Sequence, residues 1–254
     1  MTQGKPPVLV NGHGCYLLHD PELLDKPRAN FLSKGIFDQA LSCQQITQGG
    51  RGQAWFIELA GLSTVLRAYQ RGGVIAKFNQ QTYIGCSAEG SRAYKEWRLL
   101  KRMYELGLSV PRPIAASFCR WPLSFIPLYR AHILLQRIPN VQTLDHLLAK
   151  EVASEDIWKS VGACIRGFHD QGVFHADLNA NNILLDDQKI VYLIDFDKSE
   201  IRKEKQQAAP QQTQWKLDNL QRLKRSLLKQ QGLRSTYHFS EADWDVFMSA
   251  YLST

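Results

Sequence analysis

The chain has 254 residues, 44% of them hydrophobic and 22% charged, as is typical of a globular protein with a hydrophobic core. No apolar run approaches the roughly 18 residues needed to cross a bilayer, and the first residues lack the apolar stretch of a signal peptide, so we expect a cytoplasmic protein. The net charge of +7 indicates an anionic partner, such as a nucleotide, a nucleic acid, an anionic lipid or a phosphorylated sugar.

The five cysteines are scattered along the chain: Cys15, Cys43, Cys86, Cys119 and Cys164. Their odd number and the lack of a C-x-x-C pair favour neither a disulfide framework nor a zinc site. We therefore expect reduced thiols.

The first 45 residues or so show no clear hydrophobic periodicity. The stretches Gly12–Gly14 and Asp20–Glu22 resemble turns. We expect this region to be an N-terminal extension packed on the first lobe, with His13 and His19 as surface histidines.

A glycine cluster follows, in which Gly50 and Gly52 would let the backbone approach phosphate oxygens without a Cβ in the way. Glycine clusters are usually simple turns, so the cluster is a weak indication by itself. The runs Trp55–Leu59 and Thr64–Tyr69, on either side of the turn Ala60–Gly61, then predict a β-hairpin.

The second strand of this hairpin carries a candidate phosphate-binding cation. In kinases a lysine at this place contacts the donor phosphates and pairs with a glutamate on a helix. Here the strand offers Arg67, whose guanidinium can bind both phosphate and carboxylate. Lys77 is the alternative, since its surroundings superficially mimic V-A-I-K, but it follows what looks like a further turn.

A helical pattern extends from Glu89 to Leu106 and is ended by Gly107. On this helix Glu96 is the expected partner of Arg67. The alternative is that Glu96 is an exposed glutamate that pairs with Arg92 or Lys101 on the same helix.

The run Leu128–Arg137 is predicted to be a strand ending at a hinge between two lobes. If adenine binds, we expect it to hydrogen-bond the backbone near Gln136–Ile138. Two helices of a second, helical lobe are expected over Thr143–Leu148 and Ile157–Gly172, and His169 on the latter is expected to pack against neighbours or to face solvent.

The most informative stretch is His175–Asn182, followed by two apolar runs that predict a short hairpin with Asp195 after its second strand. This layout matches the kinase signature H-R-D-x-x-x-x-N followed by D-F-G. Asp177 would orient the attacking hydroxyl and can take its proton, while Asn182 and Asp195 would bind magnesium. Taken alone, either aspartate would more often be an ordinary loop or turn residue.

The last part of the chain begins with polar sequence over 202–214, which we expect to form a mobile loop. An amphipathic helix is predicted over Trp215–Gln231, with its basic residues on one face, and a final helix over Ser240–Leu252. The basic face is either a solvated surface or a face that lies against an anionic membrane.

Three features argue against a protein substrate. The short tail leaves no room for a large helical subdomain with a peptide-binding segment. Asn179 replaces the lysine that Ser/Thr protein kinases place two residues after the catalytic aspartate, and Asp197 stands where D-F-G has glycine. A compact kinase for a small or lipid-linked hydroxyl fits better.

The chain resembles the 3-deoxy-D-manno-octulosonic acid (Kdo) kinases, relatives of the lipopolysaccharide heptose kinases. The resemblance covers most of the chain and is carried by the following segments: Gly50–Gly52 with Ala54–Trp55, Val65–Arg67 with Tyr69, Arg71–Gly73, Glu96, Val110–Ala115, His175–Leu185 and Tyr192–Lys198. It implies ATP- and Mg²⁺-dependent phosphorylation of the 4-hydroxyl of Kdo on a lipid A precursor. It also implies a peripheral position at the cytoplasmic face of a Gram-negative inner membrane, and it favours a basic helix that faces this anionic surface.

We therefore expect an α+β, two-lobed, protein-kinase-like fold in a single domain over 1–254. The N-lobe (about 1–137) would be a small antiparallel sheet with one main helix, and the C-lobe (about 138–254) mostly helical with a short catalytic hairpin. Alternatives are a heptose kinase, an aminoglycoside- or choline-type small-molecule kinase, or a pseudokinase scaffold. Nucleic-acid binding is not expected, because the chain shows no recognised module for it.

Overall fold

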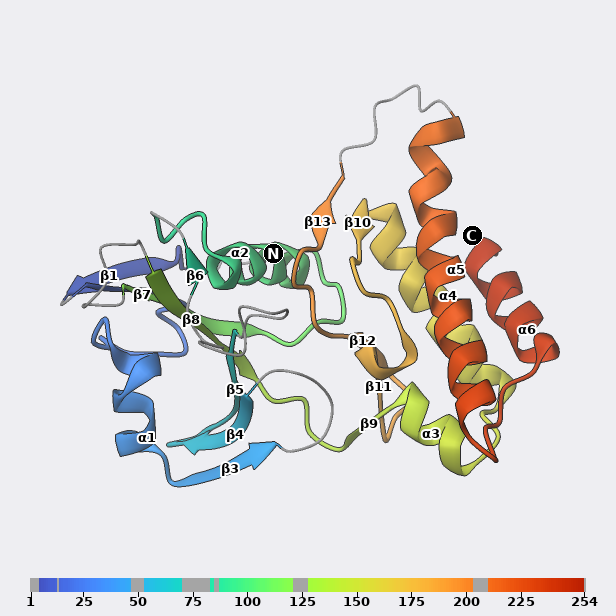
Figure 1. Ribbon diagram of the computed structural model, residues 1–254, viewed down its shortest axis with the longest axis horizontal. Helices are drawn as coiled ribbons and strands as arrows, with labels where there is room; N and C mark the ends of the chain where they lie inside the picture. The colour runs from blue at the N-terminus through green and yellow to red at the C-terminus, as the bar shows by residue number, and fades with distance from the viewer. Residues whose placement is uncertain are drawn as a thin grey trace. The chain divides into compact units, whose positions relative to one another are not determined.

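The computed structural model describes residues 5–12, 14–46, 53–69, 83–84, 87–120, 128–202 and 210–253 (Figure 1). The chain divides into two compact units. Unit 1 contains Met1–Lys101 and Arg112–Arg137, and unit 2 contains Arg102–Pro111 and Ile138–Thr254. The described residues form antiparallel sheets and helices, so the expected α+β class is confirmed. The arrangement of the two units as kinase lobes stays a prediction.

Unit 1 is built on an antiparallel sheet with the strand order β1-β2-β7-β8-β5-β4-β3, in which β6 also pairs with β8. The strands are β1 (Val8–Gly12), β2 (Cys15–His19), β3 (Ser42–Ile46), β4 (Gln53–Leu59), β5 (Leu62–Ala68), β6 (Tyr83–Ile84), β7 (Pro113–Arg120) and β8 (Leu128–Gln136). The helical elements are η1 (Phe31–Ser33), α1 (Gly35–Gln39) and α2 (Arg92–Glu105), the last of which continues into unit 2.

The N-terminal region is part of this sheet rather than an appended extension. Strand β2 pairs with β7 from Cys15↔Cys119 to His19↔Ala115, and β1 extends the sheet beyond β2. Cys15 and Cys119 are joined by a disulfide bond across this pair, so the expectation of reduced thiols is wrong for these two cysteines. His19 is also buried, contrary to its expected surface position, because β2 lies inside the sheet.

The predicted hairpin is confirmed as β4 and β5, which meet at Ala60–Gly61. Gly61 has a φ of +74°, a backbone conformation that glycine adopts without a steric penalty. One face of the sheet buries apolar side chains against η1 and α1. This core contains Leu17, Phe31, Leu32, Ile36, Ile57, Leu59, Leu66, Ile114, Ala115 and Leu134.

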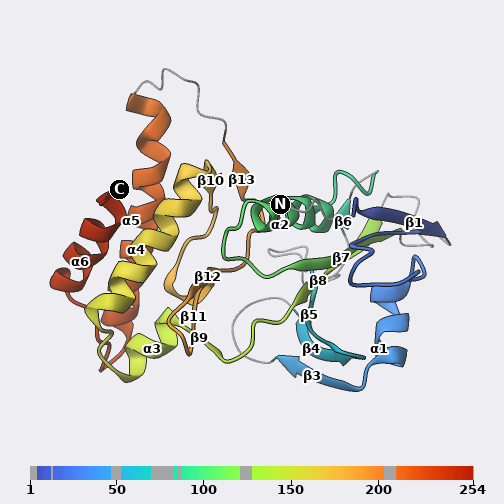
Figure 2. The same cartoon turned by 180° about the vertical axis from the view of Figure 1, so that it is seen from behind.

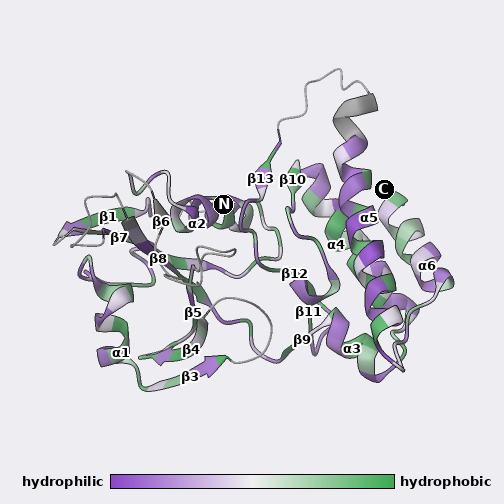
Figure 3. Cartoon of the chain, viewed as in Figure 1, coloured by the Kyte–Doolittle hydropathy of each residue, from purple (hydrophilic) through white to green (hydrophobic). Residues whose placement is uncertain are grey.

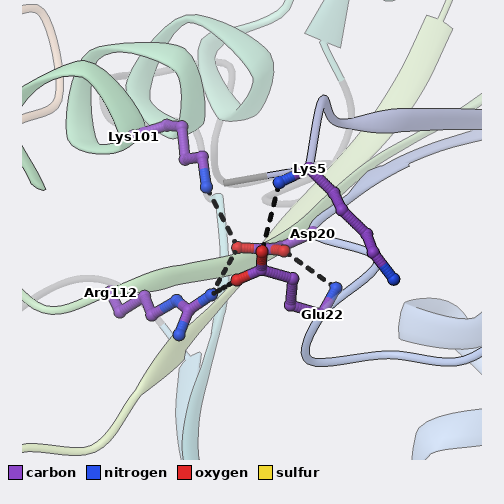
Figure 4. Close-up of polar contacts among 5 residues, drawn as sticks. All are labelled: Lys5, Asp20, Glu22, Lys101 and Arg112. Carbon is purple, nitrogen blue, oxygen red and sulfur yellow. Dashed lines mark hydrogen bonds and ion pairs between the residues drawn. The ribbon is translucent and has the colours of Figure 1, made fainter. Parts of the chain in front are cut away.

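A charged cluster around the buried Asp20 ties three parts of unit 1 together (Figure 4). Asp20 Oδ2 lies 3.1 Å from Lys101 Nζ on α2 and 3.1 Å from an Arg112 Nη just before β7. Burial alone would raise the pKa of Asp20, but hydrogen bonds from the Glu22 amide, Lys101 and Arg112 outweigh it, so the pKa lies below its ordinary value. Lys101 and Arg112 stand at the two positions where the chain leaves unit 1 and returns to it.

Unit 2 is mostly helical (Figure 2). Its helices are α3 (Leu144–Lys150), α4 (Glu155–Asp170), α5 (Pro210–Leu233) and α6 (Glu241–Leu252), with the 3-10 turn η3 (Ala180–Asn182). Its short strands are β9 (Val141–Thr143), β10 (Val173–Phe174), β11 (Ile183–Asp186), β12 (Val191–Leu193) and β13 (Glu200–Ile201). They form the sheets β12-β11-β9 and β10-β13.

The helices predicted from the sequence are present, and two of them begin with a side-chain cap. The Thr143 side chain accepts the His146 amide at the start of α3, and Ser240 and Asp243 form a capping box on α6. Gly107, with a φ of +77°, follows the end of α2, as expected. Gly162 lets α4 approach α6 closely, since a Cβ there would lie 2.5 Å from the Phe247 carbonyl oxygen.

The expected loop over 202–214 is wrong at its C-terminal end, because α5 already begins at Pro210. Proline is compatible with the first turn of a helix, where its missing N–H is not needed. Residues 203–209 lie outside the described part of the chain. None of the described helices is both long enough and apolar enough to span a bilayer.

Candidate active site

The predicted catalytic hairpin is present as the antiparallel pair β11–β12, with Ile183 opposite Leu193. The Ile194 N–H donates to the Asn182 carbonyl at 3.0 Å, which brings the residue before Asp195 against Asn182. Asp195 itself has a φ of +63°, an uncommon conformation for a residue other than glycine. Such outliers concentrate at functional sites, where the surrounding structure holds them.

Asp177 presents an exposed carboxylate on a firmly held backbone. Its side chain is 63% exposed. Its N–H donates to His175 Nδ1 at 3.1 Å, and its carbonyl accepts the Asn182 amide at 2.8 Å and the Asn179 amide at 2.9 Å. The carboxylate is therefore available to a substrate while the main chain behind it is fixed.

His175 joins the two aspartate-bearing segments. Because Nδ1 accepts from Asp177, the ring proton belongs on Nε2, which donates to the Ile194 carbonyl at 2.9 Å. Burial lowers the pKa of His175, which keeps the imidazole neutral and preserves this tautomer. The ring also lies 4.7 Å from that of Phe196, measured between centroids. His175 thus sets the backbone on both sides of the site.

Helix α5 holds the catalytic segment, a role that the sequence analysis missed. The Asn219 side chain, which is buried, donates to the His175 carbonyl at 2.7 Å and accepts the His175 N–H at 3.3 Å. His169 Nε2 also contacts Asn219 Oδ1 at 3.3 Å, and Tyr251 Oη on α6 lies 2.8 Å from His169 Nδ1. Further along the helix, Ser226 Oγ accepts the Ala180 N–H at 3.4 Å.

Arg222 lies on the same face of α5, between Asn219 and Ser226. One of its Nη atoms is 3.7 Å from Asp177 Oδ1, so a guanidinium stands beside the candidate catalytic carboxylate. From the sequence, Arg222 is expected only as one of the basic residues on the polar face of this helix. A usable signal was Asn219, a polar residue among the buried leucines of an amphipathic helix. Figure 3 shows hydrophobic and hydrophilic residues interspersed along α5.

The residues expected to bind magnesium fit that ion in donor type. The Asn182 nitrogen is bound to the Asp177 carbonyl, and this directs the Asn182 side-chain oxygen away from Asp177. Asp195 adds a carboxylate from the neighbouring segment, and magnesium prefers such oxygen ligands and completes its shell with water and substrate phosphates. Within the described residues, no three His, Cys, Asp or Glu side chains cluster closely enough to hold a metal ion.

In unit 1, the predicted pairing of Arg67 with Glu96 is confirmed. A guanidinium nitrogen on β5 lies 3.1 Å from Glu96 Oε1 on α2, and the other carboxylate oxygen accepts a short hydrogen bond from Tyr69. Glu96 is buried, whereas the Arg67 side chain is 28% exposed. Burial first, and then the Glu96 charge, raise the pKa of Tyr69. Lys101, an alternative partner for Glu96, instead contacts Asp20.

Other expected site residues are placed only in part. Gly50 and Gly52 lie outside the described residues, as does Lys77, the alternative to Arg67. Gln136 ends β8, and its N–H donates to the Arg112 carbonyl at 2.9 Å, so this amide serves the fold of unit 1. Its expected role in adenine binding stays a prediction.

Comparison with known proteins identifies relatives over most of the chain. Residues 42–251 match the model of the lipopolysaccharide kinase (Kdo/WaaP) family. A 3-deoxy-D-manno-octulosonic acid kinase of Xylella fastidiosa is 39% identical over 216 residues, which cover 84% of this chain and 82% of the relative. A kinase of the same name from Photobacterium profundum is 36% identical over 236 residues, covering 91% and 92%. The chain therefore belongs to the lipopolysaccharide kinase (Kdo/WaaP) family.

Proposed function

We propose that this chain is an ATP-dependent kinase that phosphorylates Kdo during synthesis of the lipopolysaccharide core. The observation that carries this proposal is the identity of 36–39% with relatives named 3-deoxy-D-manno-octulosonic acid kinase, over most of both chains. The exposed Asp177 on its braced loop supports it, because phosphoryl transfer needs mainly a well-placed carboxylate and charge stabilisation.

In this proposal the acceptor is the 4-hydroxyl of a Kdo residue on a lipid A precursor. Asp177 orients this hydroxyl and takes its proton as the hydroxyl oxygen bonds to the terminal phosphorus of ATP and the bond from that phosphorus to ADP breaks. Asn182 and Asp195 hold magnesium, which neutralises charge on the phosphates when bound. Residues of unit 1, namely Arg67, Glu96, Gly50, Gly52 and the backbone at Gln136, bind the nucleotide.

The test is phosphate addition measured by mass spectrometry. The purified protein, ATP and magnesium would be incubated with a lipid A precursor that carries one Kdo, and in parallel with the same precursor lacking Kdo. We expect one added phosphate on the first lipid only, located at the 4-position by fragmentation. Equal labelling of both lipids, or transfer only to a heptose or an aminoglycoside, would contradict the assignment. ATP turnover with any acceptor excludes a pseudokinase.

The role of Arg67 can be tested through ATP affinity. Its guanidinium combines partial exposure with an ion pair to a buried glutamate, so it is held in place while it remains accessible to an anion. Arg67→Ala should raise the KM for ATP by about 10- to 100-fold, the usual effect of losing a charge-assisted hydrogen bond. Lys77→Ala is the matched comparison. If only Lys77→Ala raises the KM for ATP, Lys77 and not Arg67 binds the ATP phosphates.

We also propose peripheral attachment at the cytoplasmic face of the inner membrane, where a lipid-linked acceptor would be found. The net charge of +7 supports it. On α5, Arg222 faces Asp177, and Lys224 pairs with Glu241 at 2.6 Å. The exposed basic residues Arg225 and Lys229 are the candidates for contact with a membrane. Replacing both exposed residues by glutamate should weaken sedimentation with anionic vesicles and leave neutral vesicles unaffected. Unchanged sedimentation would remove α5 from the membrane-binding surface.

A further inference from the structure

The face of α5 that carries Asn219, Arg222 and Ser226 is fixed against the catalytic segment. These residues are three and four positions apart, so they lie on one side of the helix. Asn219 and Ser226 anchor it through hydrogen bonds to the backbone of His175 and Ala180. The position of Arg222 beside Asp177 therefore follows from anchors on both sides of it along the helix.

The contact between Arg222 and Asp177 contributes little to folding. At 3.7 Å it is longer than a charge-assisted hydrogen bond, and the two side chains are 46% and 63% exposed. Exposed ion pairs of this kind contribute only slightly to stability. A guanidinium has several N–H groups in a planar fork, and one distant contact leaves this fork available to a second anion.

The proposed acceptor supplies such an anion. Kdo is a sugar acid, and its carboxylate and its 4-hydroxyl are carried by nearby carbons of the same ring. A sugar that places its hydroxyl on Asp177 therefore brings a carboxylate into the neighbourhood of Arg222. Guanidinium and carboxylate groups match in a bidentate geometry, which also orients the ring.

We propose that Arg222 binds the carboxylate of the acceptor sugar and so selects a sugar acid over a neutral sugar. This inference rests on the proposed function and adds a specificity-determining residue to it. Arg222 would thereby help to fix which hydroxyl lies on Asp177. The anchors at Asn219 and Ser226 set this part of α5 beside Asp177 before the acceptor arrives.

The experiment changes the enzyme and the acceptor together. Wild type and Arg222→Ala would be assayed with a lipid A precursor bearing one Kdo, and with the same lipid after its Kdo carboxylate has been converted to a methyl ester. With the free acid, Arg222→Ala should lower kcat/KM by about 10- to 100-fold. With the ester, wild type and Arg222→Ala should have similar values of kcat/KM. Esterification removes the carboxylate charge, so wild type also loses the interaction between Arg222 and the acceptor.

Arg98→Ala is the matched control, since Arg98 is an exposed arginine of helix α2, and it should behave like wild type. Arg222→Lys should restore part of the activity on the free acid. An equal loss on acid and ester would overturn the proposal and indicate that Arg222 acts on the nucleotide or through Asp177. No loss on either lipid would also overturn it. If folded wild type phosphorylates neither lipid, the proposed function itself fails.

Discussion

Two polar clusters hold the molecule together in different ways. In unit 1, Asp20 uses buried charge, with Lys101 and Arg112 as partners. In unit 2, Asn219 and His175 use neutral hydrogen bonds to fix the catalytic segment. Removing one partner of a buried ion pair leaves an uncompensated charge, whereas neutral hydrogen bonds can fix a loop without adding a net charge beside it. The comparison shows that the catalytic segment is held without using the exposed charges of Asp177 and Arg222.

The largest effect on kcat should come from removing the charge of Asp177, whose backbone is held by the hydrogen bonds around His175. Asp177→Asn keeps the shape of the side chain but removes the group that accepts a proton, so kcat should fall by about 10²- to 10⁴-fold. Because the carboxylate is exposed, the free energy of unfolding should change by no more than about 0.5 kcal/mol. Transfer assays and urea unfolding measure the two quantities. Asp187→Asn, in an exposed turn, is the control, and retained transfer would refute the role of Asp177.

Asp20→Asn should have the opposite effect, with a large loss of stability and little change in kcat. It leaves Lys101 and Arg112 without their shared carboxylate, and breaking a buried ion pair typically costs about 3–5 kcal/mol. The protein that remains folded at low temperature should keep nearly normal kcat. Urea unfolding and transfer assays on one preparation would measure both. A large fall in kcat with unchanged stability would show that this cluster serves catalysis instead.

Asn219→Ala should reduce stability and activity together. It leaves the buried N–H and carbonyl of His175 without partners, which we expect to cost about 2–4 kcal/mol. kcat should fall because Asp177 is held through His175, while the KM for ATP should change little. Asn181→Ala, at an exposed asparagine of η3, provides the comparison. Loss of stability with normal kcat in the folded fraction would limit Asn219 to a structural role.

The buried histidines and Asp20 should respond to acid in separate pH ranges. Burial lowers the pKa of His169 to about 4 and also lowers that of His175, and in unit 1 it likewise lowers the pKa of His132 to about 4 and that of His19, so the unfolded chain binds protons more readily than the folded one. Stability should therefore fall by about 3–6 kcal/mol as the pH drops from about 6.5 toward 4. Asp20, whose pKa is below its ordinary 3.8, should add to the loss only below about pH 4. Urea unfolding between about pH 7 and 4.5 measures the loss of stability caused by the histidines. The Asp20→Asn variant should show the same loss in this range. A free energy of unfolding that does not change with pH would contradict the lowered pKa values of the histidines.

The catalytic segment could be predicted because its chemistry is contiguous in the sequence. Asp177, Asn182 and Asp195 lie within one loop and one hairpin, so their spacing reports their geometry. The pairing of Arg67 with Glu96 was also accessible, because a known layout of strand and helix predicted it. Family membership required the resemblance of several separate motifs, since charge and composition admitted several classes of anion-binding protein.

Contacts between distant segments could not be predicted in the same way. Asn219 acts 44 residues away from His175, and an amphipathic pattern does not say which element covers a helix face. The N-terminal strands were missed although apolar runs flank the turn at Gly12–Gly14. Five-residue strands are too short for periodicity to be decisive, and their pairing with β7 is a long-range choice. The disulfide between Cys15 and Cys119 follows from that pairing, at a sequence separation of 104.

The hydrogen bond between Tyr251 and His169 has a consequence for genetics. Tyr251 is joined through His169 and Asn219 to the backbone of His175, so residue 251 connects to the catalytic segment by an unbroken relay of side chains. An allele that ends the chain before residue 251 would remove this tyrosine and break the relay at its first hydrogen bond. The relay makes such an allele a loss-of-function candidate.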